Sequence, residues 1–284
     1  MAIDYDHIMS LKGEPTDVTY RDTETMLYAL GVGFGRDPMN TDELPFVYEN
    51  GLKAVPSMAT VLTFAAQGFL ATSGINFMLL LHGEQRLTFK KPLPAQGTIT
   101  MESRIAGAYD KGEGKGALVI TETTVTEKDT GDEICTLQMT AFCRGDGGFG
   151  GPTEGAPEPH VMPEREADGS FECDTRPDQA LLYRLSGDRN PLHSDPEFAK
   201  MAGYDQPILH GLCTYGTVCR GVLTNLVDYD PAKIKTYNVR FASPVMPGQT
   251  IVTEYWKDGN QISLRASVKE TGKVVLNNGL VELN

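Results

Sequence analysis

Several features are scarce in this chain of 284 residues, and each shortage excludes a class of protein. No apolar run reaches the roughly 18 to 20 residues that a membrane-spanning helix needs, so we expect no membrane insertion. The first residues, MAIDYDHIMSLKG, lack the basic start and the apolar stretch of a signal peptide. The five cysteines form no CxxC pair and no zinc-ligand spacing, which predicts a reduced cytoplasmic protein without a bound metal.

Cations are scarce as well. The formal net charge of −13 disfavours nucleic acid and anionic membrane surfaces as partners. A phosphorylated ligand would therefore need basic residues gathered in one place. One stretch holds five of them: Arg86, Lys90, Lys91, Lys111 and Lys115. A solvated face is the ordinary interpretation of such a group, but glycines surround Lys111 and Lys115 and weaken it.

The chain repeats itself. LTFKKPLPAQGTI (87–99) aligns without a gap with VRFASPVMPGQTI (239–251) at an offset of 152. RDTETMLYALGVG (21–33) aligns with RPDQALLYRLSGD (176–188) at an offset of 155. Because the offsets stay close and the order is kept, we interpret the sequence as a duplication.

A segment rich in Gly, Pro and Glu lies between the copies, at 144–166. Such a composition supports neither a helix nor a paired strand for long, so it indicates a linker. We expect a first domain at 1–146, a linker at 147–166 and a second domain at 167–284.

Each copy shows the same order of elements. A long helix is expected at Ser57 to Ala71 in the first copy and at about 210–226 in the second, where apolar residues recur on one side. Strands rich in β-branched residues follow at 98–106, 117–127, 133–143, 250–256, 261–268 and 273–283. This order predicts an α+β fold in which each antiparallel sheet wraps around a central helix. Two such sheets could join edge to edge and so hide two exposed edges.

The residues best suited to chemistry are Asp188, Asn190 and His193. Pro191 disfavours a helix there and pushes Asn190 into an extended conformation. A turn would let the carboxylate and the imidazole face one site for proton transfer. Asp and Asn beside Gly and Pro are also ordinary turn formers, so the spacing alone leaves both interpretations open.

His210 and Gly211 follow at the expected start of the second long helix. A helix N-terminus presents unpaired N–H groups and the positive end of the helix dipole. A glycine at that point lets a carbonyl oxygen approach closely, as an oxyanion site requires.

These segments carry a resemblance to a known family. SGDRNPLH and ILHGLCTYG closely resemble the signature of the MaoC-like, (R)-specific enoyl-CoA hydratases, called hydratase 2. The similarity extends over nearly the whole chain, through MLYALGVG, LHGEQRL, DKGEG and RFASPVMPGQTI, and is greatest to the two-domain hydratase 2 module of the peroxisomal multifunctional β-oxidation enzyme. It implies a double hot-dog fold, a homodimer, no cofactor, and hydration of trans-2-enoyl-CoA to (3R)-3-hydroxyacyl-CoA.

The resemblance also implies roles for single residues. Asp188 and His193 match the catalytic pair, Asn190 orients the site, and the N–H of Gly211 binds the thioester oxygen. Four further residues match positions that line the substrate: His82, Gly83, Lys111 and Phe241. For His82 and Phe241 the alternative is a strand residue packed in a core. Glu49 matches an acidic position, which we interpret as a buried structural carboxylate.

The duplication assigns the chemistry to one copy. Asp188, Asn190 and His193 align with Gly33, Gly35 and Pro38, so the first copy lacks the acid–base groups. We expect its glycines to open room for an acyl chain. The loop at 106–117, longer than its counterpart, should contact the CoA phosphates through its basic residues.

Two other functions stay possible at this point. A hot-dog thioesterase would act on the same class of thioester, but it would not need the Asp-x-Asn-Pro-x-His spacing. A non-catalytic acyl-CoA-binding protein would not retain all three polar residues. The sequence leaves open the acyl-chain length and type, which member of the pair acts as the base, the oligomeric state and the pathway.

Overall fold

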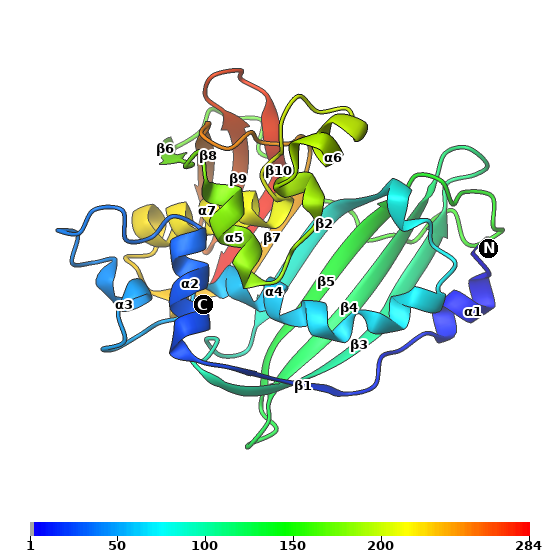
Figure 1. Ribbon diagram of the computed structural model, residues 1–284, viewed down its shortest axis with the longest axis horizontal. Coiled ribbons are helices and arrows are strands. Elements are labelled where there is room, and N and C mark those ends of the chain that lie inside the picture. Colours follow the sequence, from blue (N-terminus) through cyan, green and yellow to red (C-terminus); the bar gives the residue numbers. More distant parts are fainter. Residues whose placement is uncertain (1–2) are drawn as a thin grey trace.

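The two halves of the sequence build one continuous antiparallel sheet in the computed structural model, which describes residues 3–284 (Figure 1). The strand order is β1-β3-β4-β5-β2-β7-β10-β9-β8-β6, in which the second five strands mirror the first five. The strands are β1 (Thr16–Tyr20), β2 (Leu80–Phe89), β3 (Gly97–Asp110), β4 (Ala117–Glu127), β5 (Glu133–Cys143), β6 (Gly169–Asp174), β7 (Ile234–Phe241), β8 (Thr250–Asp258), β9 (Gln261–Val268) and β10 (Val274–Leu283).

The halves join where β2 pairs with β7, the two strands that the internal repeat aligns with each other. Gln85 lies opposite Val239 and Thr88 opposite Thr236. The N–H of Leu87 also donates to the side chain of Asn238 at 3.1 Å. This seam confirms that the two sheets join edge to edge. Only the short strands β1 and β6 remain as free edges, which limits the backbone available for unwanted pairing.

The strand predictions are confirmed where β-branched residues dominate. Strands β4, β5 and β9 begin and end at the predicted residues, and β3, β8 and β10 differ by a few residues at their ends. Four strands were missed: β1, β2, β6 and β7. Two of them, β1 and β6, are short edge strands, and β2 carries Gly83 and several charged residues, so its alternation is weak.

The central helix of the second half, α7 (Gly211–Leu226), agrees with the prediction to within one residue. Its residues are buried on nearly every side, because the sheet covers one face and α2 packs on another. Gly216 permits this approach, since a Cβ there would lie 2.5 Å from Val32 and 2.8 Å from the hydroxyl of Tyr28. Gly221 has the same effect toward β6, where a Cβ would collide with Phe171.

The long helix expected at Ser57 to Ala71 is wrong. The segment consists of short pieces instead: 3-10 turns at Pro56–Met58, Thr63–Ala66 and Gly68–Thr72, and one α-helical turn, α4 (Ala59–Leu62). The hydroxyls of Thr60 and Thr63 donate to carbonyls three residues earlier, at 2.7 and 2.8 Å. Such bonds compete with the helical ladder, and Gly68 weakens the helix further.

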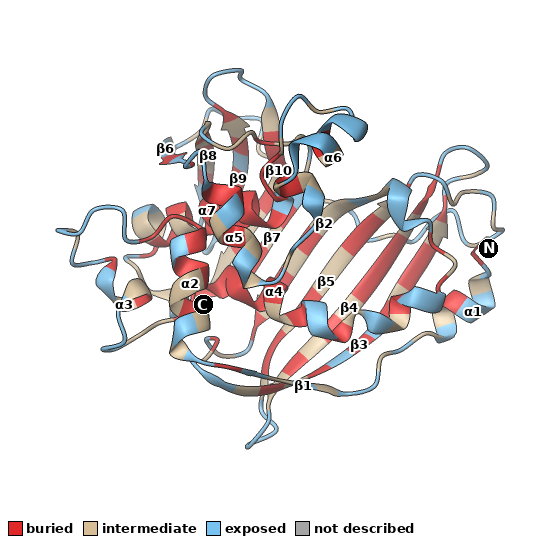
Figure 2. Ribbon diagram, viewed as in Figure 1, coloured by how far each residue is buried: buried red, intermediate tan, exposed pale blue. Residues whose placement is uncertain are grey.

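The remaining helices cover the same face of the sheet as α7 and α4 (Figures 1 and 2). They are α1 (Tyr5–Ser10), α2 (Asp22–Gly31), α3 (Leu44–Val47), α5 (Gln179–Tyr183) and α6 (Pro196–Met201), with further 3-10 turns at Phe77–Leu79, Arg184–Ser186, Pro191–His193 and Pro231–Lys233. Helices α2 and α5, which the repeat aligns, pack against each other through Tyr28 and Tyr183, with ring centroids 5.9 Å apart. The main core lies between these helices and the sheet.

Residues 144–166 contain neither a helix nor a strand, in agreement with the composition of this segment. It is nevertheless held in place. Arg86 donates to the carbonyls of Pro157 and Glu158, and the indole N–H of Trp256 donates to the carbonyl of Arg165. The division into two domains at its ends stays a prediction. Within residues 3–284, no helix combines the length and the apolar character needed to cross a membrane.

Candidate active site

The segment from Arg184 to Ser194 forms two tight turns rather than an α-helix. A 3-10 turn ends at Gly187, whose φ of 133° is accessible to glycine but strained for other residues. The carboxylate of Asp188 accepts from the N–H of Asn190 at 3.1 Å, and the amide oxygen of Asn190 accepts from the N–H of Leu192 at 3.0 Å. These bonds fix the loop and use one oxygen of each side chain, so the second carboxylate oxygen of Asp188 and the amide nitrogen of Asn190 stay available to a ligand.

His193 ends the second turn and is 8% exposed. Its Nδ1 lies 2.9 Å from the carbonyl oxygen of Ile208. A carbonyl can only accept, so Nδ1 carries the hydrogen and Nε2 presents a lone pair. Burial lowers the pKa of His193, and the Ile208 carbonyl and Asp188 offset this only in part. The ring is therefore neutral at pH 7 and suited to accept a proton.

His210 is the N-cap residue of α7 and stacks on His193, with ring centroids 3.8 Å apart. Its Nε2 donates to the backbone carbonyl of Asp188 at 3.1 Å, which ties the loop to the helix start. Burial and, to a smaller extent, the neighbouring His193 lower the pKa of His210 to about 4. The sequence predicts this residue at the helix start, and only the tertiary structure brings it into the acid–base cluster.

Gly211 is the first residue of α7 and is exposed. Its N–H has no hydrogen-bond acceptor among residues 3–284, as expected for the first turn of a helix. A Cβ at this position would lie 3.4 Å from the ring of Phe241, at the end of β7. Phe241 thus packs beside the first residue of α7, and a Cβ there would make an ordinary van der Waals contact with its ring.

His82 and Gly83 lie on β2, next to the seam. The ring of His82 contacts that of Phe241, with centroids 4.7 Å apart, and its Nε2 is buried with no partner in the described part of the chain. Burial lowers the pKa of His82 to about 4, while the nearby charge of Asp188 raises it. Gly83 sits at a register shift, where a Cβ would lie 3.1 Å from the carbonyl oxygen of Thr140. Gly83 therefore has a structural reason to be glycine.

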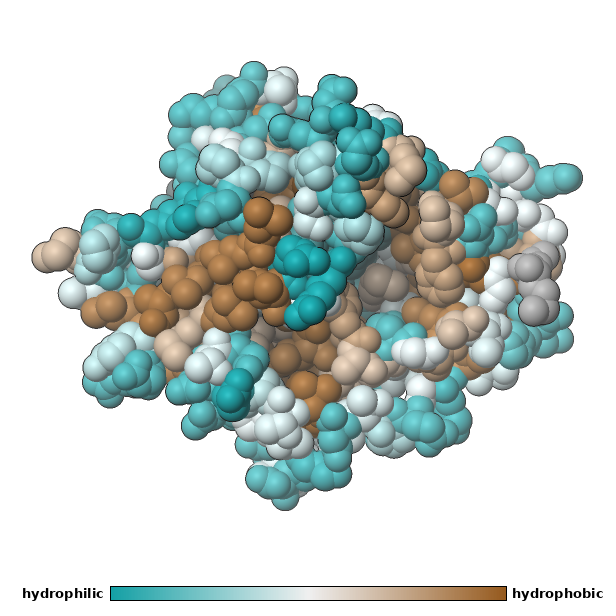
Figure 3. Space-filling model, viewed as in Figure 1, coloured by the Kyte–Doolittle hydropathy of each residue, from teal (hydrophilic) through white to brown (hydrophobic). Residues whose placement is uncertain are grey.

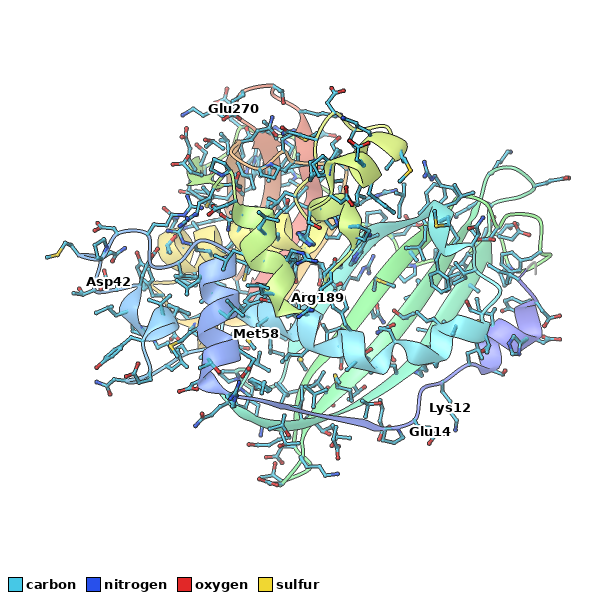
Figure 4. The ribbon with its side chains drawn as sticks, viewed as in Figure 1. Lys12, Glu14, Asp42, Met58, Arg189 and Glu270 are labelled. Carbon is cyan, nitrogen blue, oxygen red and sulfur yellow. The ribbon has the colours of Figure 1, made fainter. Side chains whose placement is uncertain are left out.

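Buried polar atoms without a protein partner gather around this cluster. Among residues 3–284 they include His82 Nε2, Tyr183 Oη, Arg184 Nε, Ser186 Oγ and His210 Nδ1. Since nearly all buried polar groups in folded proteins are hydrogen-bonded, such a concentration indicates a site that binds a polar ligand or water. The surface is hollowed over β2 and β5, between the 59–72 segment and the loop that carries Arg189 (Figures 3 and 4).

Lys111 lies apart from the cluster. It follows the end of β3, is exposed, and its N–H bonds to the carbonyl of Gly116. Strand β3 is three strands from β2, roughly 14 Å at the usual spacing of strands. The expected group of five cations does not form either. Lys91 pairs with Glu127 and Asp132 at the opposite end of the sheet.

The expectation for Glu49 is wrong. Glu49 is exposed, and the buried carboxylate is Glu43, which is 2% exposed, accepts from the N–H of Gly35 and pairs with Arg220 on α7 at 2.6 Å. That Gly33 and Gly35 open room for an acyl chain stays a prediction, and Gly35 lines a cavity together with Leu30, Phe34 and Arg36. Both glycines have positive φ. A Cβ at Gly35 would also lie 3.3 Å from the side chain of Val47. Their backbone conformation explains them.

Comparisons with known proteins agree with this arrangement. Residues 18–145 match the MFE-2 hydratase 2 N-terminal domain, and residues 159–279 match the MaoC like domain. The chain is 38% identical to the peroxisomal enoyl-CoA hydratase 2 of Arabidopsis thaliana, over 95% of this chain and 93% of that protein. It is 42% identical to the peroxisomal multifunctional enzyme type 2 of Mus musculus, where it covers 93% of this chain but only 36% of the longer enzyme.

The crystal structure of a MaoC-like dehydratase from Phytophthora capsici superposes with a TM-score of 0.87 at 34% identity, covering 98% of both chains. The expected double hot-dog architecture of the α+β class is thereby confirmed. Because full-length relatives share more than a third of their residues with nearly the whole chain, this protein belongs to the MaoC-like hydratase 2 family.

Proposed function

We propose that the protein adds water reversibly to trans-2-enoyl-CoA and forms (3R)-3-hydroxyacyl-CoA. It is an enoyl-CoA hydratase, and therefore a hydro-lyase, as the names of its relatives support. One observation carries the proposal. The lone pair of a neutral, buried His193 and the carboxylate of Asp188 lie beside the start of α7, where the N–H of Gly211 has no acceptor within residues 3–284.

The chemistry follows from these groups. A water held between Asp188 and His193 loses a proton as its oxygen attacks C3, and C2 receives a proton on the same face. Negative charge then develops on the thioester oxygen. The N–H of Gly211 and the positive end of α7 stabilise that charge, and removal of one such donor typically raises the barrier by about 3 to 4 kcal/mol. We assign the first proton transfer to the Asp188–His193 pair rather than to one of the two residues.

We assign the two halves different tasks. The second half supplies the acid–base groups, and the first half holds the substrate. Phe64, in the interrupted helical segment, supports this assignment: it is 37% exposed and lies 3.4 Å from the Cβ position of Gly187. The interruption leaves an apolar wall beside the hollow instead of a continuous helix. His82 and Phe241 would line the reacting end of the substrate, and Lys111 would contact the CoA end from the exposed hairpin.

The assembly and the location are proposals too. Three leucines are exposed on α2, on α5 and in the 3-10 turn after α5, where apolar side chains gather on the surface (Figure 3): Leu30, Leu181 and Leu185. Such a patch supports a homodimer. The five cysteines are all buried and unpaired, which fits the expected reduced, cytoplasmic environment. The proposed domains remain 1–146 and 167–284, with the linker between them.

The decisive experiment follows crotonyl-CoA and a long-chain 2-enoyl-CoA by their enoyl absorbance, with thiol release measured in parallel. Loss of absorbance without thiol release supports hydration, and stereospecific dehydrogenases then identify the (3R) product. Thiol release without loss of the enoyl group would assign a thioesterase instead. Binding of acyl-CoA with neither reaction would assign a non-catalytic acyl-CoA-binding protein.

A further inference from the structure

The first half retains a cavity at the counterpart of the catalytic loop. The repeat aligns residues 188–193 of that loop with residues 33–38 of the first half. An open cavity of about 480 Å³ lies at this place, within the roughly 300 to 1,000 Å³ that is usual for small-molecule sites. Both halves line it, with Leu30, Phe34, Gly35, Arg36, Arg176 and Leu182. The duplication thus leaves a second hollow that the proposed catalysis does not use.

A guanidinium takes the place of the catalytic carboxylate in this cavity. Gly33 aligns with Asp188, and a Cβ on Gly33 would lie 3.4 Å from Nη2 of Arg36. The side chain of Arg36 therefore folds back over the position that carries the carboxylate in the second half. The charge at the counterpart site is inverted, because a cation stands where the other half has an acid.

Arg36 makes few contacts within the protein. A guanidinium carries five N–H donors and stays charged at any physiological pH. Within residues 3–284, the side chain of Arg36 makes one hydrogen bond, from Nη2 to the amide oxygen of Gln179 at 2.8 Å, and no salt bridge. Partial burial lowers the pKa of Arg36, Arg220 and Arg176 lower it further, and Asp174 offsets this only in part. The surroundings therefore disfavour the cation and supply too little negative charge to balance it.

Carboxylates near the cavity are bound to other partners. Glu43 pairs with Arg220 on α7 at 2.6 Å. Asp178 accepts from the guanidinium of Arg176 at 2.8 and 3.0 Å. The chain has a net charge of −13 and hence many acidic side chains, yet none of the described ones pairs with Arg36. Its remaining N–H donors are available to an anion from outside the chain.

The walls of the cavity are apolar. Leu30 is 39% exposed and Leu182 is half-buried. Phe34 is held in place by its stacking on Phe46, with ring centroids 4.4 Å apart. An inorganic anion would gain nothing from such walls, whereas an alkyl chain is stabilised when they remove it from water. The planar guanidinium of an arginine matches a carboxylate through two parallel hydrogen bonds.

We propose that this cavity is a second ligand site, which binds a fatty acid of medium chain length. Arg36 holds the carboxylate, and the alkyl chain lies against Leu30 and Leu182. The site does not depend on the proposed hydration, because none of the acid–base groups takes part in it.

Direct binding tests the site without reference to activity. The full chain is titrated with octanoate by calorimetry, and we expect one molecule per chain. Arg36→Gln should weaken binding about tenfold or more, the usual result of losing hydrogen bonds to a charged group. Arg36→Lys should fall between the two, because an ammonium keeps the charge without the planar fork. Arg189→Gln is the matched control, since Arg189 is an exposed cation in the aligned loop of the second half (Figure 4).

The parent protein provides a test that needs no variant. Octanol has the same alkyl chain without the charge, and inorganic phosphate has the charge without the chain. Each should bind about tenfold or more weakly than octanoate. Increasing salt should weaken octanoate binding, because the contact with Arg36 is screened. Leu30 also belongs to the apolar patch that supports a homodimer, so sedimentation at the same protein concentrations records which form binds.

Four results would overturn the proposal. They are the absence of octanoate binding in monomer and dimer alike, equal binding by the parent protein and Arg36→Gln, an equal loss in Arg189→Gln, and binding of octanol or phosphate as tight as that of octanoate. An equal loss in Arg189→Gln would place octanoate in the catalytic hollow or reveal a general effect of charge. A protein that binds octanoate through Arg36 but hydrates no enoyl-CoA would keep this site and lose the proposed function.

Discussion

The repeat aligns Tyr28 of the first half with Tyr183 of the second, and the two hydroxyls have different surroundings. In the first half the hydroxyl of Tyr28 donates to Ser57, at the start of the interrupted helical segment, at 2.9 Å. Its counterpart Tyr183 has a buried hydroxyl without a partner in the described chain, and its ring lies 5.0 Å from that of His210. The first half thus closes its helix start with its own side chains, whereas the second half keeps its helix start open and places two imidazoles beside it.

This comparison shows how a duplication divides labour. Each half retains the sheet, the packing tyrosine and a segment on the concave face of the sheet. The first half has glycines with positive φ where the second has Asp188 and Asn190. It has a broken helix where the second has α7. A binding site needs buried polar groups that have no hydrogen-bond partner within the protein. Such groups destabilise the fold, so confining the site to one half limits the loss of stability.

We expect the largest effect from substitutions of the acid–base groups in the second half. Asp188→Asn and His193→Gln should each lower kcat for crotonyl-CoA by about 10²- to 10⁴-fold, the usual contribution of a positioned acid or base. Acyl-CoA binding and the circular dichroism spectrum should be retained. Gly33→Asp in the first half should create no second activity on an Asp188→Asn background. Near-normal turnover in either single variant would make the assignment of the pair wrong.

The start of α7 offers a sharper test. Gly211→Pro removes the free N–H, and proline is well tolerated at the first position of a helix. His210 already has φ −58° and ψ 138°, which a residue before proline adopts readily. We expect kcat to fall about 10²- to 10³-fold, the range for loss of one oxyanion donor. Gly211→Ala keeps the N–H and meets the same Phe241 ring, so a loss as large in Ala as in Pro would indicate steric blockage.

Acid should destabilise the fold around His82, on β2 of the first half. Burial lowers the folded-state pKa of His82 to about 4, below its unfolded value of about 6.5. The unfolded state therefore binds more protons between these values. The contribution of neutral His82 to the free energy of unfolding is complete above pH 6.5. It is lost as the pH falls toward 4, by up to about 3 kcal/mol. His82→Gln should flatten the pH dependence of the free energy of unfolding over that window, and His7→Gln should leave it in place. An unchanged slope in His82→Gln would refute this cause.

We expect a smaller effect, a loss of stability, from substitution of the positive-φ glycines in the first half. Gly35→Leu should lower the free energy of unfolding by about 1 to 3 kcal/mol, because its φ of 72° is strained for leucine and Val47 is close. Turnover per folded molecule should fall equally, or not at all, for crotonyl-CoA and long-chain substrates. A loss restricted to long substrates would restore the expectation that this position makes room for the acyl chain.

The smallest effect concerns the CoA end. Lys111→Ala should raise KM a few-fold with little change in kcat, because a contact remote from C2 and C3 acts equally in the ground and transition states. Increasing salt should weaken the parent protein toward the variant, since an exposed ion pair is screened over about 8 to 10 Å. Lys91→Ala, at the opposite end of the sheet, is the control. If Lys111→Ala leaves KM unchanged, the contact with CoA must be assigned to other cations near the site.

The sequence determined the parts of this protein that depend on local pattern. β-branched alternation located β4, β5 and β9 to the residue, and the repeat predicted two similar units with sheets joined at one seam. The run from Asp188 to His193 indicated a loop with polar groups. These features can be predicted from the sequence because periodicity and turn residues depend on a few neighbouring positions, and the repeat is visible by direct alignment.

The tertiary structure alone decided which groups meet. It stacked His210 on His193 and placed Phe241 beside Gly211 and His82. It also separated Lys111, at the end of β3, by three strands from Arg86 on β2. It also chose Glu43 over Glu49 as the buried carboxylate. Contacts of this kind join residues far apart in the chain, so their energies depend on the register of strands and the docking of helices. No local pattern records that register, which explains why the fold could be predicted more fully than the site.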